Sequence, residues 1–124
     1  MKAFSDLEQS KKLAEILPLE SADMYWWSSG KRYYIEAMDD GDFNEKEGHI
    51  RAWSLAALIN IIPQELFDGE YIINITEGID NKWIITYDHY ENRNHSFYGL
   101  SAGADNLVDA CYEMIIKLHE QNLL

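Results

Sequence analysis

Apolar residues recur every three or four positions in three stretches of the chain, the spacing that places them on one face of a helix. The first stretch ends at Pro18, and Ser5 followed by Glu8 three residues later has the pattern of a capping box at its start. The second stretch, AWSLAALINIIP, spans residues 52–63 and also stops at a proline. Both stretches are predicted to be helices that bury one face.

A third and longer helix is predicted after Asn106. We expect Asn106 to cap it, because an asparagine side chain can accept a hydrogen bond from the backbone N–H at the third helical position, here that of Asp109. The apolar stripe of this helix is expected to face the core. It consists of Val108, Cys111, Ile115 and Leu118.

The stretch YWWSSGKRYY, residues 25–34, places five aromatic residues around a Ser-Ser-Gly turn and is predicted to be a β-hairpin. With Ser29-Gly30 as the turn centre, period-two alternation sorts the side chains onto two faces. The face expected to be buried carries Met24, Trp26, Tyr33 and Ile35. The face expected to be half exposed carries Asp23, Tyr25, Trp27, Arg32, Tyr34 and Glu36, with a cation–π contact between Arg32 and Trp27. A three-residue loop would shift this register.

The alternation is clearest in EYIINIT and KWIITYD, which are joined by EGIDN and predict a second hairpin. The opposite, polar face carries Asn74, Thr76, Thr86 and Asp88. A third strand, HSFYG, is expected to return beside this hairpin and to add Phe97 to the apolar face. That apolar face consists of Tyr71, Ile73, Ile75, Trp83, Ile85 and Tyr87.

The predicted elements follow the order α-ββ-α-βββ-α. Runs of strands broken by single helices are typical of an α+β protein, so we expect an antiparallel sheet of about five strands with the helices packed on one face. A length of 124 residues suits a single domain, residues 1–124, with one core.

The excess of acidic residues limits the kinds of partner that the protein can bind by charge. The chain carries 22 Asp and Glu against 10 Lys and Arg, a formal net charge of −12. Such a surface repels nucleic acids and anionic membranes, so a partner recognised by charge is expected to be a basic protein. Solubility alone is the simpler explanation of the same charge, and it is the one that we prefer.

Half of the twelve residues in the segment 36–47 are acidic, against the single base Lys46. Gly41 among them favours a turn, and turns are exposed, so this segment is the predicted partner-binding site. Its acidic residues are Glu36, Asp39, Asp40, Asp42, Glu45 and Glu47. The alternative is a small-ligand site, for example for a sugar stacked on Tyr25, Trp27 and Tyr34.

Residues Gly99 to Gly103 form a G-x-S-x-G sequence around Ser101, the pattern of a hydrolase nucleophile. Asp109 and His119 follow in the order of a triad, but both fall on the helix directly after the serine, where neither can swing back to it. The motif is instead expected to be a flexible connection between strand and helix. A minor hydrolase using Ser101 is kept as an alternative, and the protein is predicted not to be an enzyme.

Candidate metal ligands match no complete motif. Asp40, Asp42 and Asn44 begin like a calcium loop, but Glu45 stands where glycine is needed and Arg51 where a glutamate is needed. A second group, around a turn, has no zinc-site spacing. It consists of Asp88, His89, Glu91 and His95. The sequence therefore predicts no metal and no cofactor.

The single cysteine, Cys111, allows no intramolecular disulfide and suits a reducing compartment. The first residues, MKAFSDLEQSKKLAEILP, lack the apolar run of a signal peptide. Together they predict a cytoplasmic protein.

Three segments resemble a family of small uncharacterised proteins carried by phages and mobile elements of gut bacteria. They are SADM at 21–24, AWSLAALINIIP at 52–63 and DACYEMIIKLHE at 109–120. Where the family pattern has prolines before AWSL and at the start of the last helix, this chain has Arg51 and Leu107. The resemblance implies a phage or mobile-element setting and brings no catalytic residue. The resulting expectation is a non-catalytic acidic accessory protein that binds a basic host or phage protein; the oligomeric state stays open.

Overall fold

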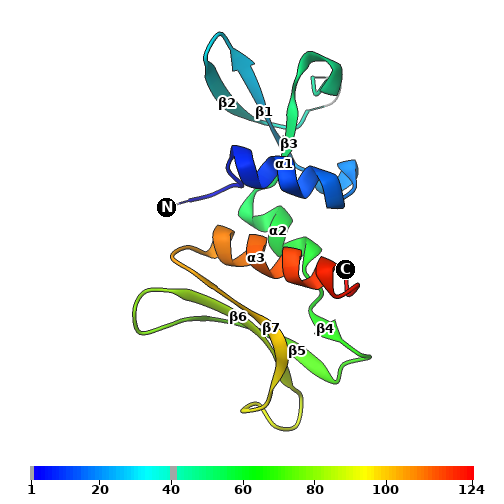
Figure 1. Ribbon diagram of the computed structural model, residues 1–124, viewed down its shortest axis with the longest axis vertical. Coiled ribbons are helices and arrows are strands. Elements are labelled where there is room, and N and C mark those ends of the chain that lie inside the picture. The colour runs from blue at the N-terminus through cyan, green and yellow to red at the C-terminus, as the bar shows by residue number, and fades with distance from the viewer. Residues whose placement is uncertain (1, 40–41) are drawn as a thin grey trace.

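The computed structural model describes residues 2–39 and 42–124, which form an elongated α+β molecule (Figure 1). Three α-helices and two 3₁₀ turns lie among seven strands in this part of the chain. The helical elements are α1 (Leu7–Ile16), η1 (Leu19–Ser21), η2 (Glu45–Glu47), α2 (Leu55–Ile61) and α3 (Leu107–Glu120). The strands are β1 (Met24–Ser29), β2 (Arg32–Ala37), β3 (Ile50–Ala52), β4 (Glu65–Leu66), β5 (Tyr71–Glu77), β6 (Trp83–His89) and β7 (Ser96–Ala104).

The α+β class is confirmed, but the expectation of one five-stranded sheet is wrong. The strands form two antiparallel sheets, a three-stranded one in the order β2-β1-β3 and a four-stranded one in the order β4-β5-β6-β7. In Figure 1 the helices lie between the two sheets. Two short strands, β3 and β4, complete the sheets, and segments of three and two residues are too short for an alternating pattern to reveal.

The four-stranded sheet and α3 follow the sequence pattern closely. Ile73 pairs with Tyr87 and Ile75 with Ile85, so the predicted apolar residues share one face, and Ile85 and Tyr87 are fully buried. Phe97 packs against the same core from β7. The predicted stripe of α3, from Val108 to Leu118, is likewise fully buried.

Of the two predicted helix caps, the one for α3 is confirmed and the one for α1 is wrong. Asn106 caps α3, and its side chain accepts the backbone N–H of Asp109 at 2.9 Å. The cap of α1 is Asp6, in a capping box with Gln9, instead of Ser5 with Glu8. Ser5 is one position too early for that role.

Ser5 is instead a fully buried hydroxyl between two segments. Its Oγ accepts the backbone N–H of Trp53 at 3.0 Å and lies 2.7 Å from the Oγ of Ser10. These bonds tie the start of the chain to the segment before α2.

Two of the segments that carry the family resemblance bind each other. The indole N–H of Trp53, a fully buried residue, donates to the Oγ of Ser21 at 3.0 Å. Asp23 accepts the backbone N–H of Ser54 at 2.8 Å and also its hydroxyl, while Ser54 caps α2. SADM and AWSL are thus joined by side-chain hydrogen bonds, which gives both a packing role.

The first hairpin turns at Gly30-Lys31, one position later than expected, with Gly30 at φ +66°. Trp26 therefore pairs with Ile35 and Trp27 with Tyr34. Each residue of β1 thus pairs with a residue of β2 two positions later than expected. Because side chains alternate with a period of two, each side chain stays on its predicted face. The predicted burial holds only in part. Tyr25 is 4% exposed and Tyr33 47%, the reverse of the prediction, whereas Met24, Trp26 and Ile35 are partly buried and Tyr34 is 41% exposed.

Candidate functional site

The acidic segment, residues 36–47, connects β2 to β3 through η2 at the end of the molecule formed by the small sheet (Figure 1). Glu36 belongs to β2, and Glu45 and Glu47 belong to η2. Asp40 lies outside the described residues. The remaining acidic side chains of the segment are exposed, as the turn composition predicts.

Aromatic packing holds this segment against the small sheet. The ring of Tyr25 is stacked with the imidazole of His49 at a centroid distance of 5.0 Å, and the ring of Phe43 meets Tyr25 edge-on at 5.8 Å. The Nδ1 atom of His49 accepts the backbone N–H of Asn44 at 3.0 Å, and the side chain of Asn44 caps η2. Phe43 is thus an anchor in the middle of the segment, which explains why Tyr25 is buried.

Three of the acidic side chains already have neighbours. Glu36 accepts the hydroxyl of Tyr25 at 3.0 Å, and Arg51 donates to Glu45 at 2.9 Å. Glu47 lies 3.8 Å from His49. Burial, the bond to Glu36 and the nearby negative charges raise the pKa of Tyr25 above its ordinary value.

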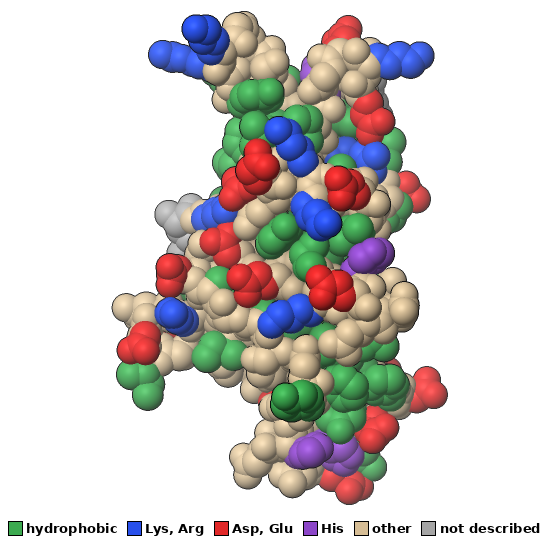
Figure 2. Space-filling view, viewed as in Figure 1, with side chains coloured by type: hydrophobic (Ala, Val, Ile, Leu, Met, Phe, Trp, Pro, Cys, Tyr) green, Lys and Arg blue, Asp and Glu red, His purple; other side chains and the backbone are tan. Residues whose placement is uncertain are grey.

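Asp39 and Asp42 differ from these three. Both are exposed, and within residues 2–39 and 42–124 neither makes an ion pair or a side-chain hydrogen bond. Figure 2 shows that acidic and basic side chains are interspersed over the helical part of the face in view. Asp39 and Asp42 therefore stand out as carboxylates that a partner can reach without first breaking an ion pair or a side-chain hydrogen bond to another described residue.

The expected aromatic face of Tyr25, Trp27 and Tyr34 is not an open surface. Tyr25 lies beneath Phe43 and His49, as described above. The rings of Trp27 and Tyr34 stack on each other at 4.8 Å instead of standing free, and Trp27 has Tyr34 where a contact with Arg32 was expected. The indole nitrogen of Trp27 is buried without a hydrogen-bond partner among the described residues.

The G-x-S-x-G motif lies inside β7, so the expectation of a flexible connection is wrong. Leu100 and Ala102 point into the core, and Ser101 between them is exposed. Alternation along β7 explains this arrangement, because the motif has an apolar residue at every second position. Lys117 donates to the backbone carbonyl of Ser101.

The two residues that follow in triad order are placed elsewhere. Asp109 accepts hydrogen bonds from Lys2 at 2.7 Å and from Gln9 at 2.8 Å, and His119 is an exposed residue of α3. Burial alone would raise the pKa of Asp109, but the bonds from Lys2, Gln9 and Asn106 outweigh it and lower that pKa. No hydrogen bond joins Ser101, Asp109 and His119 among the described side chains.

The residues around the β6–β7 turn divide between two faces. Asp88 lies on the polar face of the sheet, where it accepts from Asn74, Thr86 and Ser96 at 2.7–2.9 Å. His89 and His95 line an open pocket of about 350 Å³ on the other side, with Glu70, Tyr71 and Asn92. The part of the chain that the structure describes contains no group of three His, Cys, Asp or Glu placed to hold a metal ion.

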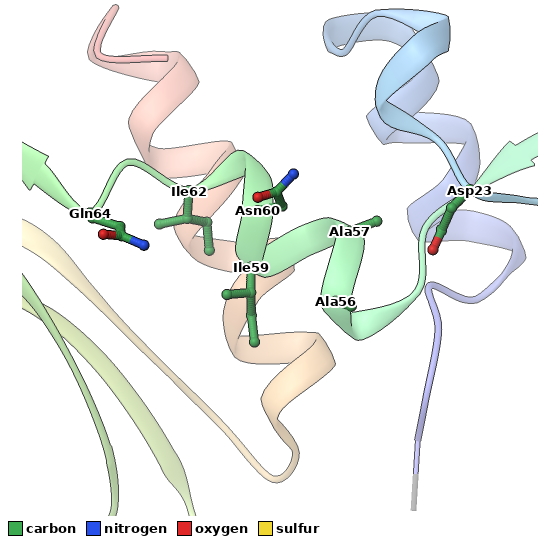
Figure 3. A pocket seen from close by; sticks show the side chains of 7 residues that line it. All are labelled: Asp23, Ala56, Ala57, Ile59, Asn60, Ile62 and Gln64. Atoms are coloured by element: carbon green, nitrogen blue, oxygen red, sulfur yellow. The ribbon is translucent and has the colours of Figure 1, made fainter.

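Two further hollows were not indicated by the sequence. A shallow groove of about 510 Å³ runs along the outer side of α2, where Figure 3 shows Asp23, Ala56, Ala57, Ile59, Asn60, Ile62 and Gln64. A more enclosed, largely apolar pocket of about 460 Å³ lies between α2, β6 and the start of α3. Its walls are Lys2, Leu55, Trp83, Asp105, Asn106 and Leu107. These residues are far apart in the chain, so periodicity could not bring them together.

Among the described residues, none of the helices has the length and apolar character needed to cross a bilayer. Comparison with protein-family models, with curated proteins and with solved structures found no match.

Proposed function

We propose that this protein is a non-catalytic interaction protein that binds a basic protein of a host or phage through its acidic segment. One observation carries the proposal: Asp39 and Asp42 are exposed and unengaged among the described residues, on a segment anchored by Phe43, Tyr25 and His49. An anchored segment loses less conformational entropy on binding than a free loop does. Exposed carboxylates also speed the approach of a basic partner.

The proposal predicts a local charge effect. Replacing both Asp39 and Asp42 with Lys should weaken partner capture and leave the melting temperature nearly unchanged, because exposed charges contribute little to stability. The matched control replaces Glu77 and Asp80 with Lys, two exposed acids at the β5–β6 turn that give the same change in net charge.

The measurement is affinity purification from the native host with quantitative mass spectrometry, followed by titration of the recovered partner at two salt concentrations. Binding by charge should weaken as salt rises, because screening shortens the reach of exposed charges to ~8–10 Å. The proposal fails if both double variants capture the partner equally well or if binding is insensitive to salt.

Small-ligand binding is a second candidate, favoured by the apolar pocket between α2, β6 and α3. Trp83 and Leu107 offer an apolar wall. Lys2 is already bonded to Asp6 and Asp109, so Asp105 supplies the charge of the pocket that has no ion-pair partner among the described residues. That arrangement suits a flat apolar molecule that carries an amine.

Benzylamine and benzoate test the ligand candidate as a matched cationic and anionic pair. In NMR titrations, benzylamine should shift the resonances of Trp83 and Leu107, and benzoate should shift them far less. Equal shifts from the two molecules, or none from either, would exclude an amine site here.

A further inference from the structure

Strand β2 forms one edge of the small sheet. The sheet order is β2-β1-β3, so the outer side of β2 has no neighbouring strand in the part of the chain described. In Figure 1 the β1–β2 hairpin rises from the helices, and β2 lies on its outer side. A second strand can therefore approach this edge without meeting the helical layer.

The backbone groups available at this edge follow from the hairpin turn. Ser29 and Arg32 flank a two-residue turn, and such a pair exchanges both of its hydrogen bonds. The backbone N–H and C=O groups of every second residue from Arg32 onward then face β1. Met38 follows in this series, and its N–H does donate to the carbonyl of Asp23 at 2.9 Å. The N–H and C=O groups of Tyr33 and Ile35 consequently face outward.

Charge is distributed unequally along β2. Lys31 and Arg32 lie at the hairpin tip, and Figure 2 shows basic side chains at the end of that hairpin. Glu36 lies at the opposite end of the strand, and Asp39 follows shortly after it. Two copies of β2 that run antiparallel would place the basic end of each beside the acidic end of the other, whereas parallel copies would place like charges together.

We propose that two copies of this chain pair through their β2 edges in a symmetric antiparallel dimer with Tyr34 on the two-fold axis. In this register Tyr33 of one copy faces Ile35 of the second, so the outward backbone groups of both strands bond each other. Arg32 faces Glu36 of the second copy on both sides of the axis. Moving the axis to Ile35 would leave Arg32 opposite Met38 and lose that pairing.

The same register gives the exposed rings of β2 a partner. Tyr34 is 41% exposed and stacks on Trp27. At the axis the two Tyr34 residues form a directly opposed pair without mutual backbone hydrogen bonds, the position at which cross-strand side chains lie closest. The stacked rings of Trp27 and Tyr34 would then meet the same pair of the second copy and leave water.

The dimer goes beyond the proposed function and does not depend on it. Asp39 and Asp42 lie past the end of β2, so a basic protein can still reach them when the edge is occupied. The two ideas also fail separately, because one is tested by partner capture and the other by the association of the purified chain alone.

Charge-swap variants test the register. Sedimentation velocity at physiological salt should show a concentration-dependent dimer, and Arg32→Glu or Glu36→Arg alone should raise its Kd about tenfold or more, since each puts like charges opposite each other twice. An equimolar mixture of the two single variants should restore association, because every Glu then faces an Arg. Lys82→Glu changes an exposed residue just before β6, and this charge control should leave the Kd unchanged.

Ile35→Pro tests the edge independently of charge. Proline removes an N–H that points away from β1, and proline is tolerated where the missing N–H would face solvent. This variant should remain folded by circular dichroism and should sediment as a monomer; if it does not fold, the charge-swap mixture decides. A wild-type chain that stays monomeric at all concentrations, or a dimer that none of these variants weakens, would overturn the proposal.

Discussion

The buried hydroxyl of Ser5 offers the sharpest test of the fold, because sequence and structure assign it different roles. Ser5→Ala removes the acceptor for the backbone N–H of Trp53 and the partner of the Ser10 hydroxyl, both in a fully buried setting. An exposed N-cap, the role predicted from the sequence, would cost ~1 kcal/mol when replaced by Ala.

The structure predicts a larger loss. An orphaned buried N–H costs ~1–3 kcal/mol, and the lost bond between the two hydroxyls costs ~1 kcal/mol more. Ser5→Ala should therefore lower the free energy of unfolding by ~2–4 kcal/mol, which corresponds to a fall in Tm of about 10 °C for a chain of this size. Ser10→Ala should cost only ~1 kcal/mol, because Ser5 keeps its bond to Trp53.

Urea unfolding followed by circular dichroism measures these values, provided that the m-value stays constant. The double variant should lose less than the sum of the single variants, since the Ser5–Ser10 bond can be removed only once. A Ser5→Ala loss below ~1 kcal/mol, matched by an equal loss for Glu8→Ala, would contradict the buried role and favour the capping box that starts at Ser5.

Three further predictions concern the larger sheet and α3. Asn106→Ala should cost ~1 kcal/mol in urea melts, because it removes the cap that binds the N–H of Asp109; a neutral result would mean that another residue caps α3. Although burial opposes it, bonds from Ser96, Asn74 and Thr86 lower the pKa of Asp88, so its contribution to stability is complete above ~pH 4 and is lost as pH falls through the folded pKa. Melts of Asp88→Asn should accordingly lack that part of the acid dependence, and an unchanged acid profile would contradict this assignment. Burial raises the pKa of Cys111 to about 12, so a thiol reagent should label it only after unfolding, and rapid labelling of the native chain would show that α3 opens.

The sequence predicted best where a long element has one buried face. The β5–β6 hairpin and α3 each carry enough apolar residues at a fixed period to define their faces, and the structure places those residues as expected. The periodicity of a segment cannot predict its contacts with segments that are distant in the sequence. The bond from Ser5 to Trp53 spans 48 positions, and nothing in the local pattern at Ser5 distinguishes a buried acceptor from a helix cap.

The remaining differences between prediction and structure arise where the prediction relied on residue composition. Glycines at 99 and 103 favoured a loop, yet the apolar residues between them needed a strand to reach the core. The acidic segment was located from composition alone, but the anchoring role of Phe43 and the engagement of Glu45 by Arg51 depend on tertiary contacts. Composition therefore indicated where the candidate site lies, and only the fold separates Asp39 and Asp42 from the other acids.

The C-terminal end of α3 has a consequence for how the protein resists aggregation. Lys117 and Gln121 donate to the backbone carbonyls of Ser101 and Gly99, in the strand at the outer edge of the larger sheet. That strand, SFYGLSAGA, contains no charged residue, a composition that attracts further strands when its edge is open. Local opening at that end of the helix would release both carbonyls and leave the edge free to pair with a strand of another molecule. Conditions that fray the end of α3 without unfolding the sheet are therefore expected to promote aggregation.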